Sequence, residues 1–230
     1  METHGLVADR ALLGRTSTAE RVAGILRARI SEGFFPPGAR LAEEEITEAL
    51  GVSRNTLREA FRLLTHERLL VHELNRGMFV RVPDVDDVKD LYRVRKLVEC
   101  AVARSAAPST EDLEPVEAAV REGRLALRKR DWQALGTANI KFHEALVALA
   151  GSARITELMR AALAELRLIF HVMDNPRWFH EPYLTRNKEI LAALREGNGP
   201  HAEALLAKYL NDAEQQLVEA YALRRVEHLK

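Results

Sequence analysis

Apolar side chains in the first third of the chain recur at helical spacing in three short segments. Ser17 and Glu20 have the spacing of a capping box, and the apolar residues after them predict a helix that ends at Gly33. A short helix is predicted next over residues 41–50, and a third over residues 54–67. The “GVS” between these last two supplies a tight turn and an N-cap serine.

Two short runs of branched and apolar residues, “LLVHE” and “MFVRV”, follow the third helix. They are joined by “LNRG”, in which Gly77 can adopt the positive φ that a tight hairpin turn needs. This pattern predicts a small β-hairpin. Pro83 and the acidic “DVDD” then predict a linker over residues 83–86, whose aspartates can cap the next helix.

Beyond this linker, the periodic segments all have the spacing of helices. Breaks at Pro108, “RDW”, Gly151, “DNPRW” and “GNGP” separate six predicted helices. They cover residues 86–106, 110–130, 131–150, 153–173, 181–196 and 200–225. The pattern therefore predicts a mainly α protein. Its parts are a flexible tail over residues 1–17, a helix-rich unit with a β-hairpin over residues 18–82, the linker, and an all-α bundle of six helices over residues 87–230.

Composition is typical of a globular protein, with 47% apolar and 30% charged residues. No apolar run is long enough to cross a membrane and no secretion signal is visible, so we expect a cytoplasmic protein. Cys100 is the only cysteine and can form no intrachain disulfide.

The net charge is zero, but residues 41–52 hold four glutamates and no base, whereas residues 53–82 hold six arginines and three glutamates. This uneven placement predicts a local basic surface.

The third predicted helix has two chemically different faces. Its apolar residues share one side, and the other side carries Arg54, Asn55, Arg58 and Arg62. A helix of this kind, placed after a short helix and a turn, predicts a helix-turn-helix that reads the major groove of DNA. Arginine suits this task because its planar guanidinium can bond a guanine edge in two places or grip a phosphate.

The hairpin makes this a winged helix-turn-helix. Gly77 lets the backbone approach the minor groove closely, and Arg76 beside it meets the negative potential of that groove. We expect the acidic turn of the second helix to face away from the phosphates. The alternative is a solvated amphipathic helix whose arginines merely pair with Glu59 and other nearby acids.

The stretch “PPGARLAEEEITEALGVSRNTLREAFRLLTHERLLVHELNRGMFV” resembles the winged-helix domain of GntR-type transcription regulators. The remainder, with “LYRVRKLVECAVARSAA” and “NIKFHEAL”, resembles the effector-binding domain of the FadR branch, and six helices rather than seven are similar to the VanR-type subgroup. The resemblance implies that Arg54 and Arg58 read bases, that Arg40 grips phosphate, and that Gly77 enters the minor groove. Thr56 departs from the family, which commonly has proline there, so we expect a changed operator preference rather than a changed fold. The DNA-binding candidates are Arg40, Ser53, Arg54, Asn55, Thr56, Arg58, Arg62, Arg76 and Gly77.

A charged pair interrupts the apolar stripe of the first helix in the bundle. Arg95 and Glu99 fall among apolar residues, where buried charge is costly unless it is paired. One interpretation is that the two simply satisfy each other at i, i+4 spacing. The other is that Arg95 projects into a cavity and binds a carboxylate or phosphate ligand, as the resemblance implies for the matching family arginine.

Four more polar residues fall within the apolar stripes of later helices, namely Asn139, His143, Asn187 and Tyr209. The resemblance implies that many relatives have an aspartate and three histidines at matching positions, which hold a divalent metal. Here only His143 keeps a strong ligand type, with Asn139 as a weaker candidate, and neutral amides and phenols are poor ligands for zinc or nickel. We therefore expect a metal-free polar pocket in which these residues and Arg95 bind a small organic acid.

These features together predict a ligand-responsive, DNA-binding transcription regulator. We expect a repressor that binds a pseudo-palindromic operator as a homodimer, since one recognition helix reads too few bases. Two alternatives stay open, a helical metal-dependent enzyme that uses His143 and a helical adaptor that no longer binds DNA. The chain lacks a second convincing base or nucleophile near His143 and a phosphate-binding glycine loop, so we expect no enzymatic activity.

Overall fold

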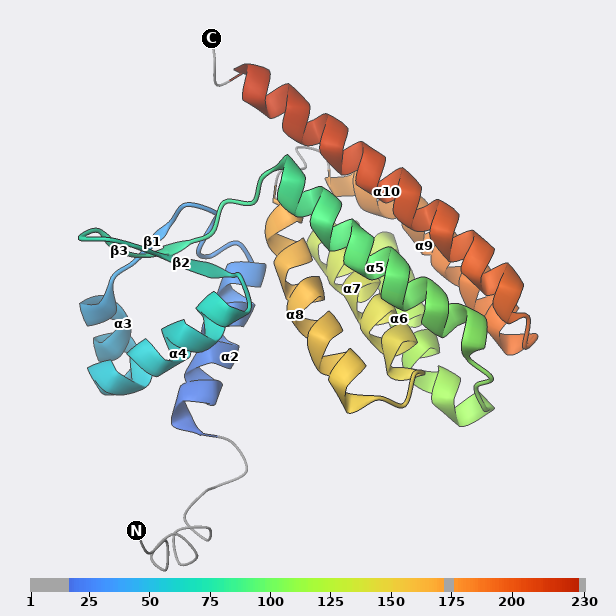
Figure 1. The fold of residues 1–230 in the computed structure, drawn as a ribbon, viewed down its shortest axis with the longest axis horizontal. Coiled ribbons are helices and arrows are strands. Elements are labelled where there is room, and N and C mark those ends of the chain that lie inside the picture. Colours follow the sequence, from blue (N-terminus) through green and yellow to red (C-terminus); the bar gives the residue numbers. More distant parts are fainter. Residues whose placement is uncertain (1–16, 172–175, 228–230) are drawn as a thin grey trace, which may run out of the picture. The chain divides into compact units, whose positions relative to one another are not determined.

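The structure is a computed structural model that describes residues 17–171 and 176–227 (Figure 1). It divides into two compact units, residues 1–82 and 83–230. The predicted fold class is confirmed, because the first unit combines helices with a small sheet and the second is all-helical. Most of the predicted tail, and residues 172–173 of one predicted helix, lie outside the described residues. No described helix is long and apolar enough to span a membrane.

The first unit is built on three helices, α2 (Thr18–Ser31), α3 (Glu43–Leu50) and α4 (Arg54–His66). The predicted capping box starts α2, with Ser17 and Glu20 bonding each other's backbone N–H groups. Gly51, at φ 62°, ends α3 in the left-handed conformation that glycine adopts without strain. The apolar faces of α2 and α4 pack together into the core of this unit. Its fully buried side chains include Ala23, Leu26, Ile30, Leu57, Ala60, Phe61 and Leu64.

The sheet has three antiparallel strands rather than the two of the predicted hairpin. The hairpin is formed by β2 (Leu70–Glu73) and β3 (Gly77–Val80), and β1 (Arg40–Leu41) pairs with the other edge of β3. The loop before β1 is tied to the same strand, since the Val80 N–H donates to the Ala39 carbonyl at 2.8 Å. A strand of two residues is too short to show an alternating pattern, so the sequence did not reveal it.

The second unit is a bundle of six described helices. They are α5 (Val85–Ser105), α6 (Thr110–Lys129), α7 (Trp132–Ala148), α8 (Ala153–Phe170), α9 (Pro176–Arg195) and α10 (Gly199–Glu227). The predicted linker at 83–86 is shorter in the structure, because Asp84 caps α5 through the Asp86 and Asp87 N–H groups. The described part of α9 also includes residues 176–180, before the predicted start at residue 181. Pro182 therefore lies inside this helix rather than in its first turn.

Helix α7 lies at the centre of this bundle. It contacts α5, α6, α8 and α9, and its buried residues cover a wide side of the helix, opposite an exposed stripe of Gln133, Lys141, Glu144 and Ala148. The long helix α10 runs alongside α5, as Figure 1 shows in red and green. Asn139 and His143 lie on the buried side of α7 and therefore face other helices, away from water.

Candidate functional site

The exposed face of α4 carries the predicted DNA-binding arginines. The side chains of Arg54, Arg58 and Arg62 are 69%, 61% and 80% exposed, while the apolar face of the same helix is buried. The Ser53 hydroxyl caps the helix by accepting from the Thr56 N–H at 3.1 Å, and the two hydroxyls lie 2.8 Å apart. Thr56 thus takes part in the cap, in the turn where the family commonly has proline.

Each of these arginines has an acidic neighbour. The Arg62–Glu59 pair lies within α4 at 3.0 Å, but Arg58 and Arg54 are paired with residues of α3. Glu43 lies 3.2 Å from Arg58 and Glu44 lies 3.8 Å from Arg54. Glu43 and Glu44 of α3 therefore lie beside the arginine face of α4, so this part of the acidic turn does not face away from the surface that is predicted to meet the phosphates. Exposed pairs of this kind are weak, so they leave the arginines available for contacts with DNA.

The wing brings the remaining DNA-binding candidates together. Gly77 has φ 105°, and a Cβ placed on it would lie 3.7 Å from the Arg40 Nε atom. Arg76 is exposed, pairs with Glu73, and has its guanidinium 5.2 Å from the centre of the Phe79 ring. Two arginines thus flank a glycine backbone at the tip of the sheet, which is a suitable surface for a phosphate backbone or a minor groove.

A chain of hydrogen bonds crosses the core of the helical unit. The Arg95 Nε donates to Glu99 at 2.7 Å, and the other Glu99 oxygen lies 2.6 Å from the His143 Nδ1. The His143 Nε2 lies 3.0 Å from the Tyr209 hydroxyl. This series of hydrogen bonds continues from the Tyr209 hydroxyl to the Asn139 side-chain oxygen, 2.9 Å away. The same oxygen also accepts from the Asn187 amide at 2.8 Å. The structure thus joins all five predicted pocket residues through Glu99, and all are buried.

Charges in this network are set by burial and by neighbours. Burial disfavours the charged form of Glu99, but Arg95 and His143 outweigh it and lower the pKa of Glu99 to about 2. Burial lowers the pKa of His143, while the Glu99 charge raises it less, so the ring is neutral at pH 7. Burial also raises the pKa of the Tyr209 phenol well above its usual value. The network therefore holds one ion pair, Arg95 with Glu99, among neutral groups.

The proton positions follow from these charges. The neutral His143 ring must carry its proton on Nδ1, because the Glu99 carboxylate can only accept. Its Nε2 is then an acceptor, so the single hydroxyl proton of Tyr209 can be donated either to His143 Nε2 or to the Asn139 oxygen, but not to both. Two buried atoms of the network have no hydrogen-bond partner, the Arg95 Nη2 and the Asn187 side-chain oxygen. The Arg95 guanidinium also lies 4.8 Å from the centre of the Tyr92 ring. Unpartnered buried polar atoms are uncommon and mark a place for a further partner.

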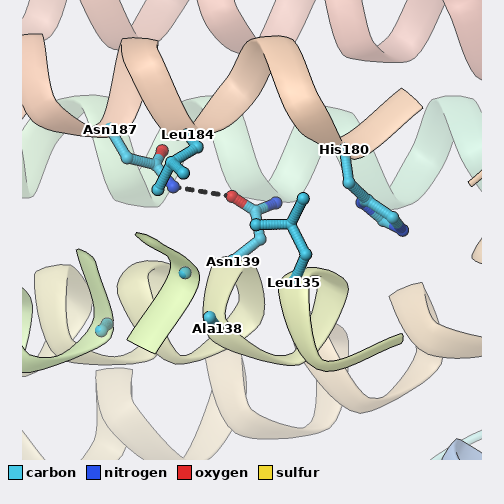
Figure 2. A pocket seen from close by; sticks show the side chains of 8 residues that line it. Leu135, Ala138, Asn139, His180, Leu184 and Asn187 are labelled. Atoms are coloured by element: carbon cyan, nitrogen blue, oxygen red, sulfur yellow. Dashed lines mark hydrogen bonds between the residues drawn. The ribbon is translucent and has the colours of Figure 1, made fainter. Parts of the chain in front are cut away.

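A narrow space between α6, α7 and α9 adjoins this network (Figure 2). Figure 2 shows His180, Leu184 and Asn187 extending from α9 towards Leu135, Ala138 and Asn139 of α7. The side chains leave no room for a water-sized sphere. The sequence left His180 unassigned, yet its ring is buried, its Nδ1 has no partner, and burial lowers its pKa to about 4. His180 lies seven residues before Asn187, a spacing that places both on one face of a helix. This signal was missed because the predicted helix began at residue 181, after His180.

The side chains of the network also determine how well it could bind a metal ion. No cluster of three or more histidine, cysteine or acidic residues able to hold a metal occurs in the part of the chain that the structure describes. In the network only Glu99 and His143 are of that type, and both ring nitrogens of His143 already face hydrogen-bond partners. Zinc and nickel prefer imidazole nitrogen, thiolate or charged oxygen ligands, and an imidazole nitrogen needs a free lone pair to bind them.

Comparisons with known proteins identify the families of both units. Residues 18–80 match the model of bacterial regulatory proteins of the gntR family, and residues 90–212 match the FCD domain. The chain belongs to the GntR family and carries an FCD domain. It is therefore a DNA-binding transcription regulator with an effector domain, and the enzyme alternative is excluded by this membership. The winged unit is the DNA-binding part, and the FCD unit contains the buried network.

Relatives of this GntR-family chain extend over nearly its whole length. It is 28% identical over 223 residues to the galactonate operon transcriptional repressor of Escherichia coli K12, covering 87% of this chain and 96% of the relative. It is 25% identical to the E. coli K12 repressor RspR, covering 86% and 88%. A crystal structure from Rhodococcus sp. RHA1, described as a candidate GntR transcriptional regulator, is 53% identical with a TM-score of 0.85, covering 90% of this chain and all of that one.

Proposed function

We propose that this GntR-family regulator is a repressor that binds a pseudo-palindromic operator as a homodimer and responds to a small organic acid in its FCD domain. The observation that supports the DNA-binding half most strongly is the two-faced helix α4, which buries its apolar side and exposes Arg54, Arg58 and Arg62. The six described helices of the second unit favour the VanR-type subgroup of the FadR branch. Two E. coli relatives are named repressors.

Each exposed group has a distinct role in this proposal. Arg54 and Arg58 read base edges in the major groove, helped by Asn55 and Arg62, because their side chains extend from the free face of α4. Ser53 and Thr56 hold the first turn of that helix. Arg40 grips phosphate beside the wing, where the Gly77 backbone and Arg76 enter the minor groove.

The DNA-binding half is tested with Arg54→Ala and Arg58→Ala. Operator duplexes are first selected from a random library with the wild-type protein, and affinity is then measured by fluorescence anisotropy at fixed salt. Each substitution is expected to weaken specific binding by roughly 1 to 3 kcal/mol without unfolding, because each removes a bidentate base contact from a polar face. Arg29→Ala removes an exposed arginine of α2 and serves as the matched control. Unchanged operator affinity in both α4 variants would contradict the proposal.

The effector half is supported by the unpartnered atoms of the buried network. The Arg95 Nη2 is a cationic donor that an anion would satisfy, and the Asn187 oxygen is an acceptor that a hydroxyl would satisfy. A hydroxy acid offers both groups. One E. coli relative is named for the galactonate operon, and galactonate is a hydroxy acid. These groups support a small organic acid bound by Arg95 and Asn187, beside Asn139, His143 and Tyr209. Such binding requires the filled space next to Asn139 and Asn187 to open.

The same network supports a site that works without zinc or nickel. The neutral phenol of Tyr209 and the amides of Asn139 and Asn187 are poor ligands for these ions. His143 would have to give up a hydrogen bond to Glu99 or Tyr209 in order to bind a metal. These residues do not fit a divalent metal, and no step of the proposed response depends on one.

The effector half is tested by thermal shift with a panel of hydroxy acids and other carboxylic acids. A bound acid raises the melting temperature of the wild type by mass action, and Arg95→Ala abolishes that shift. Because this change leaves Glu99 buried without its partner, Arg95→Lys is measured as well, since it keeps the charge but loses the planar donor edge. Arg93→Ala, on the same helix but 73% exposed, is the control.

Two results would contradict this half of the proposal. One is a ligand shift that survives both Arg95 substitutions. The other is elemental analysis that finds one tightly held transition metal per chain, whose removal by a chelator lowers stability. Ligand-free DNA binding should persist in Arg95→Lys, which separates effector binding from the function of α4.

A further inference from the structure

The contact between Glu43 and Arg58 joins the two helices of the helix-turn-helix in one specific way. The contacts use the Arg58 Nε, which lies 3.2 and 3.4 Å from the two Glu43 carboxylate oxygens. The neighbouring pair differs, because Glu44 lies 3.8 Å from a terminal nitrogen of Arg54, beyond hydrogen-bond distance. Glu43 therefore holds the inner edge of one guanidinium, whereas Glu44 is only near the other.

The edge of the Arg58 guanidinium that Glu43 contacts determines which N–H donors remain available to bind a base. Arginine has five N–H donors in one plane, of which one is on Nε and four are on the two terminal nitrogens. A guanine edge accepts two parallel hydrogen bonds, at O6 and N7. Since the Glu43 contacts use Nε, the terminal nitrogens of Arg58 can read a guanine while Glu43 keeps its hold. An exposed arginine without such a hold would lose more side-chain freedom on binding.

The charge of Glu43 has a second effect. A carboxylate beside Arg58 partly cancels the attraction of that arginine for bare phosphate, which is the main source of non-specific binding. At a cognate base the guanidinium makes directed hydrogen bonds in addition to a charge contact. The neighbouring carboxylate therefore lowers the affinity for that base less than the affinity for bare phosphate. The carboxylate thus weakens non-specific binding more than specific binding.

We propose that Glu43 is a positioning residue for DNA recognition, which orients Arg58 for one guanine and raises the ratio of specific to non-specific affinity. The inference rests on the proposed role of α4 in reading DNA. It assigns a DNA-recognition role to a residue of the acidic turn, which itself carries a charge of the wrong sign for DNA.

A competing explanation is that Glu43 only stabilises its own helix. It lies in the first turn of α3, where acids interact favourably with the helix dipole, and Ala42 offers no side-chain cap. Glu45 lies in the same turn and makes no ion pair with another residue that the structure describes. Glu43→Ala and Glu45→Ala both remove one negative charge and its favourable interaction with the helix dipole. Only Glu43→Ala also removes the contact with Arg58.

The experiment compares base preference position by position. Wild-type protein selects an operator from random duplexes, and all single-base variants of that operator then compete for wild type, Arg58→Ala, Glu43→Ala, Glu45→Ala and the double variant Glu43→Ala with Arg58→Ala. Arg58→Ala is expected to lose preference at one base pair in each half-site. Glu43→Ala should lose roughly tenfold of its preference at that same base pair, in line with one bidentate contact, and the double variant should match Arg58→Ala.

The non-specific affinity gives an independent readout. Glu43→Ala and Glu45→Ala should both bind random duplex more tightly, because each removes a negative charge, but only Glu43→Ala should lose base preference. The inference is overturned if Glu43→Ala keeps the preference that Arg58→Ala loses, or if Glu45→Ala loses it equally. Melting temperatures of the two alanine variants show whether either effect comes from unfolding. If wild type enriches no sequence at all, the proposed function falls as well, which distinguishes the two failures.

Discussion

At the scale of single residues, His180 carries a pH dependence that its surroundings impose. Burial, with a smaller contribution from the Arg167 charge, lowers the pKa of this ring from 6.5 to about 4. Between these values the unfolded chain binds a proton that the folded chain does not, so stability is full above pH 6.5 and falls as the pH drops towards 4. The loss is on the order of 3 kcal/mol across this window.

We predict that His180→Gln reduces this pH dependence. Glutamine does not titrate, so the difference in unfolding free energy between pH 7 and pH 4.5, from urea melts, should be smaller in the variant than in wild type. The other buried histidine, His143, has a lowered pKa in the same direction but is present in both proteins. An equal loss of stability in variant and wild type would show that His180 is not the source.

At the scale of elements, the start of α10 depends on a glycine. A Cβ on Gly199 would lie 2.1 Å from the Arg104 carbonyl oxygen at the end of α5, which is backbone and cannot rotate away. We predict that Gly199→Ala separates these two closely packed helices and destabilises the FCD unit by roughly 3 kcal/mol. Chemical denaturation followed by circular dichroism measures this loss.

The matched control for this prediction is the same substitution in an open position. A Cβ on Gly24 of α2 meets only the end of the Arg27 side chain at 3.9 Å. Gly24→Ala should therefore stabilise the winged unit by roughly 0.5 to 1 kcal/mol, since alanine favours a helix. A neutral Gly199→Ala would mean that α5 and α10 adjust freely to one another.

At the scale of the whole molecule, the proposed homodimer should form through the FCD unit. This unit is the larger of the two, and it leaves Leu97, Leu158, Trp178 and Leu223 exposed. We predict that the full chain and a fragment beginning at Pro83 are both dimers by light scattering at micromolar concentration. The fragment has its own extensive core, so it can be tested alone. A monomeric fragment beside a dimeric full chain would place the dimer contact elsewhere.

The sequence by itself determined the features that depend on neighbouring residues. The helices follow from apolar spacing of 3.6 residues, and their starts at Ser17, Ser53 and Asp84 follow from side chains that bond the next turn. The hairpin follows from two apolar runs around Gly77, and the free arginine face of α4 follows from the periodicity of that helix. These patterns are local, so they can be read without knowing the fold.

Only the tertiary structure decided which distant residues meet. The strand at Arg40, the contact of Glu43 with Arg58, and the place of Glu99 between Arg95 and His143 join segments that the sequence separates. The burial of His180 likewise depends on how α9 packs against α7 and α8. Periodicity shows which side of a helix turns inward, but the partner on the other side is chosen by packing across the bundle.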